Sequence, residues 1–136
     1  MSLVLDCSVA MGWCFEEEIS AYGDRVLNAL EEGEAFVPSV WPLEVSNVLV
    51  VAERRARLKV GDSARFLELL LSLPIFVEEV SLPRATGAVL SLARELDLSV
   101  YDASYLELAM RSGVPLATHD QALAKAADAV GVHRFQ

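Results

Sequence analysis

Residues 3–6 have the sequence Leu-Val-Leu-Asp, a short apolar run that ends in a carboxylate. A continuous apolar run of this length predicts a buried strand. Similar runs follow at residues 35–37, 75–80 and 116–118, separated by segments in which apolar residues keep helical spacing. Strands that alternate with helices are typical of βαβ units, in which helices cover both faces of a mainly parallel sheet. We therefore expect an α/β fold with three layers, α/β/α.

Helices are expected wherever apolar residues recur every three or four positions. Pro42 suits the first turn of a long helix, and Ser99 with Asp102 forms a capping-box pattern at the start of another. Gly33 is expected to act as a C-cap, and residues 132–135 as an edge strand. The predicted helices span residues 9–15, 20–32, 61–73, 84–96, 99–111 and 121–130. A further helix is predicted from residue 42 to the basic residues at 54–59.

The composition limits the class of partner. A chain of 136 residues, 54% of them hydrophobic and 23% charged, is expected to form a single globular domain over residues 1–136. Eleven Lys and Arg against twenty Asp and Glu give a net charge of −9. Counterion release requires a cationic surface, so this charge argues against binding of nucleic acid, or of an anionic membrane, through a broad basic face.

The cysteines and the apolar stretches indicate where in the cell the protein is expected. Cys7 and Cys14 would be about 10 Å apart on a helix, which is too far for a disulfide. With no C-x-x-C pattern and two histidines, a structural zinc site is not expected. No apolar stretch is long enough to span a bilayer, and the first residues lack the pattern of a signal peptide. We therefore expect a reduced, cytoplasmic protein.

Four carboxylates are expected at one edge of the predicted sheet, where ligands of open α/β sheets bind. Asp6 ends the first strand, Glu44 and Asp102 lie in the first turns of helices, and Asp120 follows the strand at 116–118. Each could be only a helix cap or a dipole partner, although a carboxylate after Leu-Val-Leu must be solvated, paired or metal-bound. Four such groups together would repel one another unless a cation neutralised them, and an all-oxygen cluster suits Mg²⁺ or Mn²⁺.

Four motifs, in this order and spacing, carry a resemblance that covers nearly the whole chain. They are Leu3-Val-Leu-Asp6-Cys-Ser8, Pro42-x-Glu44-x-x-Asn47, Ser99-Val-Tyr-Asp102-Ala-Ser-Tyr-Leu-Glu-Leu-Ala109 and Pro115-Leu-Ala-Thr118-His-Asp120-x-x-Leu-x-x-Ala126. The sequence resembles the PIN domain family, and more narrowly the VapC-type toxins of bacterial and archaeal toxin–antitoxin pairs. The resemblance implies a PIN-like fold and an endoribonuclease that hydrolyses RNA phosphodiester bonds. It also implies a homodimer and inhibition by a cognate antitoxin.

The resemblance further implies roles for individual residues. By it, Asp6, Glu44, Asp102 and Asp120 are the catalytic quartet that binds Mg²⁺ or Mn²⁺; the number of ions, and whether Glu44 ligates directly or through a water, stay open. Ser8 and Thr118 match small hydroxyl positions that support the site.

Two neighbouring polar residues are treated separately. Asn47 matches a polar position of the family and would share a helix face with Glu44. His119 departs from the family pattern, in which many relatives have an apolar residue. A lone histidine between a strand and a helix is more often a surface residue than a substrate contact, and its role stays open without affecting the quartet.

A small basic cluster and an excess of leucines are candidates for contacts with partners. Arg54, Arg55, Arg57 and Lys59 either form a solvated C-terminal turn, which the helix dipole favours, or contact RNA or an acidic antitoxin segment. The leucines between residues 67 and 73 exceed what one helix face needs, which suggests a groove for a partner helix or a dimer interface. Trp13, Phe15 and Trp41 are expected to pack rather than to stack on bases.

Two other classes of function compete with a nuclease. A response-regulator-like phosphoacceptor would have paired acids after the first strand and a lysine after the last; Asp6-Cys-Ser8 and Thr118-His-Asp120 supply neither. A catalytically silent PIN-like scaffold that binds a protein partner would be marked by loss of a quartet residue, and all four are present. Among these alternatives the sequence favours a metal-dependent endoribonuclease.

Overall fold

The computed structural model describes residues 1–136, and its centre is a sheet of four parallel strands. These are β1 (Ser2–Leu5), β2 (Glu34–Pro38), β3 (Ile75–Glu78) and β4 (Leu116–Ala117), in the spatial order β3-β2-β1-β4. Leu3 lies opposite Ala35, and Val4 lies opposite both Phe36 and Leu116. The predicted parallel sheet is confirmed, with β1 and β2 as its inner strands.

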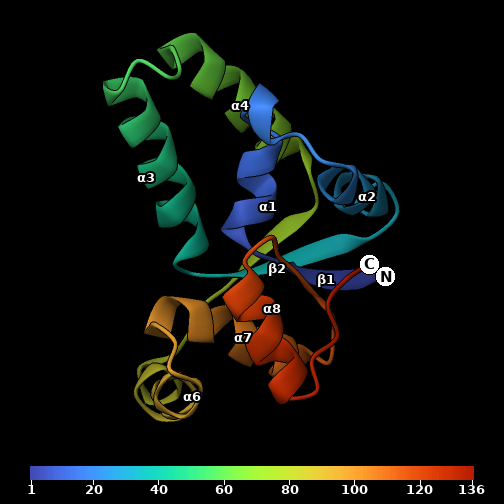
Figure 1. Ribbon diagram of the computed structural model, residues 1–136, viewed down its shortest axis with the longest axis vertical. Helices are drawn as coiled ribbons and strands as arrows, with labels where there is room; N and C mark the ends of the chain where they lie inside the picture. The colour runs from blue at the N-terminus through green and yellow to red at the C-terminus, as the bar shows by residue number, and fades with distance from the viewer.

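Helices lie on both faces of the sheet and make the three predicted layers (Figure 1). One layer contains α1 (Cys7–Gly12), the short η1 (Glu16–Glu18), α2 (Ala21–Ala29), α3 (Trp41–Arg54) and α4 (Val60–Ser72). The other contains α6 (Leu90–Leu96), α7 (Val100–Ser112) and α8 (Gln121–Ala129). Both chain termini lie beside β1, at the edge opposite the carboxyl ends of the strands.

The core is built around β1 and α7. Leu3, Val4 and Leu5 are each no more than 1% exposed, because helices cover both sides of the strand. α7 contacts β1 and β2 as well as α6 and α8, so it is buried on most of its circumference. Its buried Glu107 accepts hydrogen bonds from Arg84 at 2.7 Å and Arg111 at 3.1 Å, which compensates the buried charge.

Three predicted elements differ in the structure. The helix expected at 84–96 is divided into α5 (Leu82–Arg84), a π-helical turn η2 (Ala85–Val89) and α6. A π turn holds more residues than an α turn, so periodicity alone does not reveal it. The helix predicted at 9–15 is α1, which starts directly after Asp6. The strand predicted at 132–135 is a single bridge between Leu116 and Arg134.

Gly33 has a different role from the predicted C-cap. Leu30 caps α2, and Gly33 does not adopt the left-handed conformation. A Cβ atom at Gly33 would instead lie 2.9 Å from the Ala29 carbonyl oxygen and still closer to the Met1 carbonyl oxygen. A glycine is therefore needed at this position because β1 passes close to the end of α2.

No helix in the structure has the length and apolar character needed to cross a membrane; the longest, α3, has 14 residues.

Replacing Gly33 by alanine should destabilise the protein, because two backbone carbonyls must move to admit the methyl group. We expect Gly33→Ala to lower the free energy of unfolding by about 1–3 kcal/mol in urea denaturation. Gly87→Ala is the matched control, since a Cβ there meets nothing within 4 Å and the segment is helical. It should leave the free energy unchanged or raise it by up to about 1 kcal/mol. Equal losses for both variants would contradict the close-approach explanation.

Candidate functional site

Asp6 is the most enclosed of the predicted carboxylates. It follows β1 at the N-cap position of α1, but its side chain caps no amide of that helix. Its Oδ2 atom accepts hydrogen bonds from Ser8 Oγ at 2.6 Å and Thr118 Oγ1 at 2.7 Å. Burial raises the pKa of Asp6, the two hydroxyls lower it in part, and the charge of Asp120 adds to the increase.

Ser8 and Thr118 connect the carboxyl ends of β1 and β4. Ser8 Oγ accepts the amide of His119 at 3.1 Å, and Thr118 Oγ1 accepts the amide of Asp120 at 2.9 Å. Each hydroxyl therefore donates a hydrogen bond to Asp6 and accepts one from a backbone amide of the loop after β4. This network fixes the position of Asp120 relative to Asp6.

Glu44 is held by a residue that the sequence did not single out. It lies in the first turn of α3, and its Oε1 atom accepts a hydrogen bond from the Tyr105 hydroxyl. Tyr105 is fully buried in α7. The sequence signal that could have identified this contact is a tyrosine on an otherwise apolar helix face, because a buried phenol needs a polar partner. Burial raises the pKa of Glu44, the Tyr105 hydrogen bond lowers it, and the charges of Asp6 and Asp102 raise it further.

Asp102 takes part in only half of the predicted capping box. The Ser99 hydroxyl accepts the Asp102 amide at 3.1 Å, but the Asp102 carboxylate does not accept the Ser99 amide in return. Burial raises the pKa of Asp102, and so do the charges of Asp120 and then Asp6. The carboxylate is therefore positioned by the start of α7 and left without a neutralising partner.

Asp120 is a helix cap, as one of the alternatives predicted. Its Oδ1 atom accepts the amides of Ala122 at 2.9 Å and Leu123 at 3.1 Å at the start of α8. Its Oδ2 atom makes no hydrogen bond within the chain. The capping bonds orient the carboxylate without using all of its acceptor capacity.

The four carboxylates thus come from four segments and share one edge of the sheet. Their mutual influence is visible in the pKa values of Asp6, Glu44 and Asp102, each raised first by burial and then by the negative charge of another member. As the side chains stand, no group of three or more His, Cys, Asp or Glu residues is arranged as a finished metal site. The donor chemistry, four carboxylates without an opposing cation, is nevertheless the kind that Mg²⁺ or Mn²⁺ takes.

Asn47 and the basic cluster lie outside this network. Asn47 is exposed on α3 and makes no hydrogen bond to the carboxylates. Arg54 is ten residues beyond Glu44, which on a helix corresponds to about 15 Å. Arg54, Arg55 and Lys59 are exposed where α3 ends and α4 begins.

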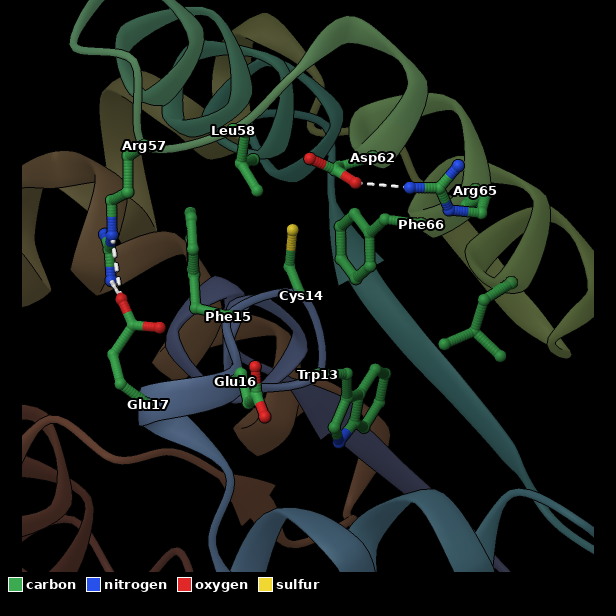
Figure 2. A pocket seen from close by; sticks show the side chains of 11 residues that line it. Trp13, Cys14, Phe15, Glu16, Glu17, Arg57, Leu58, Asp62, Arg65 and Phe66 are labelled. Atoms are coloured by element: carbon green, nitrogen blue, oxygen red, sulfur yellow. Dashed lines mark hydrogen bonds and ion pairs between the residues drawn. The ribbon is translucent and has the colours of Figure 1, made fainter.

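Arg57 is already partnered within the chain. Its guanidinium lies 3.7 Å from the centre of the Phe15 ring and donates to Glu17 at 3.0 Å and Glu18 at 3.2 Å. Figure 2 shows the ion pair between Arg57 and Glu17 beside a cavity of about 490 Å³ that Cys14 also lines. Phe15 and Trp41 are buried, and Trp13 is partly buried, so the expectation that the aromatic residues pack is confirmed.

His119 is packed rather than on the open surface. Its ring meets Tyr22 edge-on, with centroids 5.3 Å apart, and its Nε2 atom lies 3.4 Å from Ser20 Oγ. Arg134 covers the Tyr22 ring at 4.1 Å and donates to the Thr118 carbonyl at 2.9 Å. His119 is therefore only partly exposed, because the start of α2 packs against the loop that follows β4.

Comparison with known proteins identifies the family. The profile of the PIN domain family matches residues 3–129. The chain belongs to the PIN domain family. It is 29% identical to "Ribonuclease VapC3" from Pyrobaculum aerophilum over 125 residues, which cover 92% of this chain and 94% of that protein.

Solved structures of PIN-like proteins have the same fold. PAE2754 from Pyrobaculum aerophilum superposes with a TM-score of 0.72 and 25% identity, covering 98% of this chain and 83% of that one. VapBC2 from Rickettsia felis, solved bound to a DNA fragment from their promoter, gives a TM-score of 0.69 at 13% identity and covers 99% of this chain and 98% of that one. The second likeness is evidence for the fold alone.

Removing the charge of Asp102 should stabilise the protein without a bound cation. A carboxyl group whose folded pKa is raised destabilises the fold increasingly as pH rises from its unfolded pKa through its folded pKa. We therefore expect Asp102→Asn to raise Tm by about 1–3 °C near neutral pH, and by less at about pH 4.5. Glu68→Gln, at an exposed position in α4, should give no such pH-dependent gain. A gain that is equal at both pH values would contradict the charge argument.

Removing the Tyr105 hydroxyl should affect both stability and Glu44. Tyr105→Phe is expected to lower the free energy of unfolding by about 1 kcal/mol, the typical net contribution of one hydrogen bond. It should also raise the pKa of Glu44, measured by NMR titration of the side-chain carboxyl carbon, because the bond favours the ionised form. Tyr101→Phe is the control, since the exposed Tyr101 hydroxyl makes no hydrogen bond. An unchanged Glu44 titration in Tyr105→Phe would show that the contact does not hold in solution.

Proposed function

We propose that this protein is a Mg²⁺- or Mn²⁺-dependent endoribonuclease, the toxin of a toxin–antitoxin pair. The observation that carries the proposal is the set of four carboxylates, Asp6, Glu44, Asp102 and Asp120, gathered at the carboxyl edge of a PIN-domain sheet without a neutralising cation. The relative named as a ribonuclease, which aligns over nearly the whole chain, supports RNA as the substrate.

The residues around the carboxylates would hold them ready to bind a cation. Ser8 and Thr118 fix one oxygen of Asp6, Tyr105 fixes one oxygen of Glu44, and two helix amides fix one oxygen of Asp120. Each of these three carboxylates keeps its second oxygen for a ligand. A divalent cation at this site supplies activation of water for in-line attack and compensation of the phosphate charge.

A strongly acidic protein must hold RNA with few basic contacts. Arg57 is paired with Glu17 and Glu18, so Arg54, Arg55 and Lys59 are the members of the predicted cluster left to contact RNA or an acidic antitoxin segment. Since Arg54 lies about 15 Å along α3 from Glu44, and Arg55 and Lys59 follow it, these residues would contact the flank of a bound RNA. Recognition close to the scissile bond would rest on the cation and on uncharged groups.

Protein partners are the second part of the proposal. Leu67 and Leu71 of α4 are 37% and 86% exposed, and Phe76 and Val77 of the edge strand β3 are each about half exposed. Exposed apolar side chains on neighbouring elements are typical of interaction surfaces. We propose that the protein forms a homodimer and binds an antitoxin, as the VapC-type resemblance implies. A silent scaffold with the same partners is the alternative.

The nuclease proposal predicts that Asp6→Asn abolishes RNA cleavage. A purified folded RNA with single-stranded loops should be cut in the presence of Mg²⁺ and remain intact with excess EDTA. Loss of a residue that orients a metal ligand typically lowers activity roughly 10–100-fold. Loss of the ligand itself should therefore reduce kcat/KM by at least that factor. Asp24→Asn, at an exposed position in α2, should cut normally.

Calorimetric titration with Mn²⁺ distinguishes a nuclease from a silent scaffold. The wild-type protein should bind the ion, and Asp102→Asn should weaken that binding. Undiminished cleavage by Asp6→Asn, or cleavage in excess EDTA, would refute the proposal. Absence of both ion binding and cleavage would favour the scaffold.

A further inference from the structure

A small pocket lies where β2 and β3 end, at the same edge of the sheet as the four carboxylates. Its volume is about 240 Å³, and it is formed where Pro38 ends β2, Val80 follows β3, and Tyr101 and Ser104 begin α7. Because the sheet order is β3-β2-β1-β4, Asp6 and Asp120 lie toward the other side of that edge. An extended chain lying along the carboxyl edge would pass over both the pocket and these carboxylates.

Two elements carry both the pocket and the site. Tyr101 directly precedes Asp102 in the first turn of α7, and Val40 is the residue before α3, which holds Glu44. Adjacent Cα atoms are about 3.8 Å apart, so the backbone that carries Tyr101 at the pocket also carries Asp102 of the quartet. The pocket and the proposed catalytic site therefore share the segments at the start of α3 and of α7.

The lining indicates the chemistry of the occupant. No charged side chain lines the pocket, so neither a phosphate nor a metal ion suits it. Its polar side chains, apart from the phenol of Tyr101, are the hydroxyls of Ser39 and Ser104. Ser104 Oγ donates to the Tyr101 carbonyl at 2.5 Å, and Ser39 Oγ accepts the Val80 amide at 3.3 Å. Ser104 can still accept a hydrogen bond, and Ser39 can still donate one. A neutral ring with polar edges matches this lining.

Tyr101 provides a surface on which such a ring can stack. Its side chain is 59% exposed, and the preceding Val100 is 41% exposed, although both belong to the well-packed α7. The hydroxyl of Tyr101 makes no hydrogen bond in the structure, so folding does not account for an aromatic residue at this exposed position. Single-stranded RNA is commonly recognised through bases that stack on exposed aromatic side chains.

The π-helical turn borders the same pocket. Ala85 and Val89, the first and last residues of η2, both line it. π turns within α-helices are rare and frequently occur at functional sites. Here the turn contributes two apolar side chains to the lining of the pocket.

We propose that this pocket receives one unpaired nucleobase of the RNA substrate, next to the scissile phosphate, with Tyr101 as its stacking platform. The inference rests on the proposed ribonuclease activity and extends it to substrate recognition. The volume of 240 Å³ is below the roughly 300–1,000 Å³ typical of sites for drug-sized ligands, which favours a single ring system. The base supplies binding energy that the few basic residues do not.

The test measures cleavage of a short single-stranded RNA and of copies in which one nucleotide at a time is abasic. With the wild-type protein, an abasic site at one position near the cut should raise KM about 5- to 150-fold, the equivalent of one base–aromatic stack. Tyr101→Ala should raise KM for the intact RNA by a similar factor with a smaller effect on kcat, and Tyr101→Phe should recover most of the loss.

The effects of Tyr101→Ala and of the abasic site on KM should not be additive. Once Tyr101 is alanine, the same abasic site should have little further effect, whereas Met110→Ala, at an exposed position near the other end of α7, should behave as the wild type with every RNA. Wild-type cleavage that is unaffected by Tyr101→Ala and by every abasic site would overturn the base pocket and leave the nuclease intact. If Asp6→Asn cleaves as well as the wild type, the proposed function itself has failed.

Discussion

The fixed placement of Asp6 at the end of β1 is the constraint on which the rest of the site depends. β1 is an inner strand with buried residues, so the carboxylate of Asp6, which directly follows it, has little access to solvent. The two hydroxyls of Ser8 and Thr118 hold that carboxylate through one oxygen and bond the amides that follow β4. The Asp6 carboxylate is thereby linked to the loop that joins β4 to α8. The other carboxylates are arranged around it.

This arrangement opposes stability in the absence of a cation. Burial and like charges raise the pKa values of Asp6, Glu44 and Asp102, which means that ionising them near neutral pH disfavours the folded state. Hydrogen bonds from Ser8, Thr118 and Tyr105 offset part of that effect. Elsewhere the chain compensates its buried charges directly, as the Arg84–Glu107–Arg111 group shows. The contrast between a compensated cluster and an uncompensated one distinguishes a structural ion pair from a candidate ligand site.

The architecture was largely predictable, because it follows from local patterns. Short apolar runs predicted all four strands, and helical spacing predicted most helices to within a few residues. The exceptions have particular causes. A π turn divides residues 82–96, a close approach to Met1 rather than a turn requires Gly33, and only one bridge forms near Arg134. Each depends on contacts or on a helix geometry that periodicity does not record.

For the site, the sequence by itself determined which carboxylates could meet, because the order of strands and helices places Asp6, Glu44, Asp102 and Asp120 at one edge of a parallel sheet. The surroundings of these carboxylates depend on tertiary contacts. Tyr105 reaches Glu44 across 61 residues of sequence, Thr118 reaches Asp6 across 112, and Arg57 is partnered by Glu17 rather than left free for RNA. The pocket beside Tyr101 likewise draws on β2, β3, η2 and α7. Local patterns fix elements, whereas these contacts depend on how distant elements pack, so no short stretch of the chain contains them.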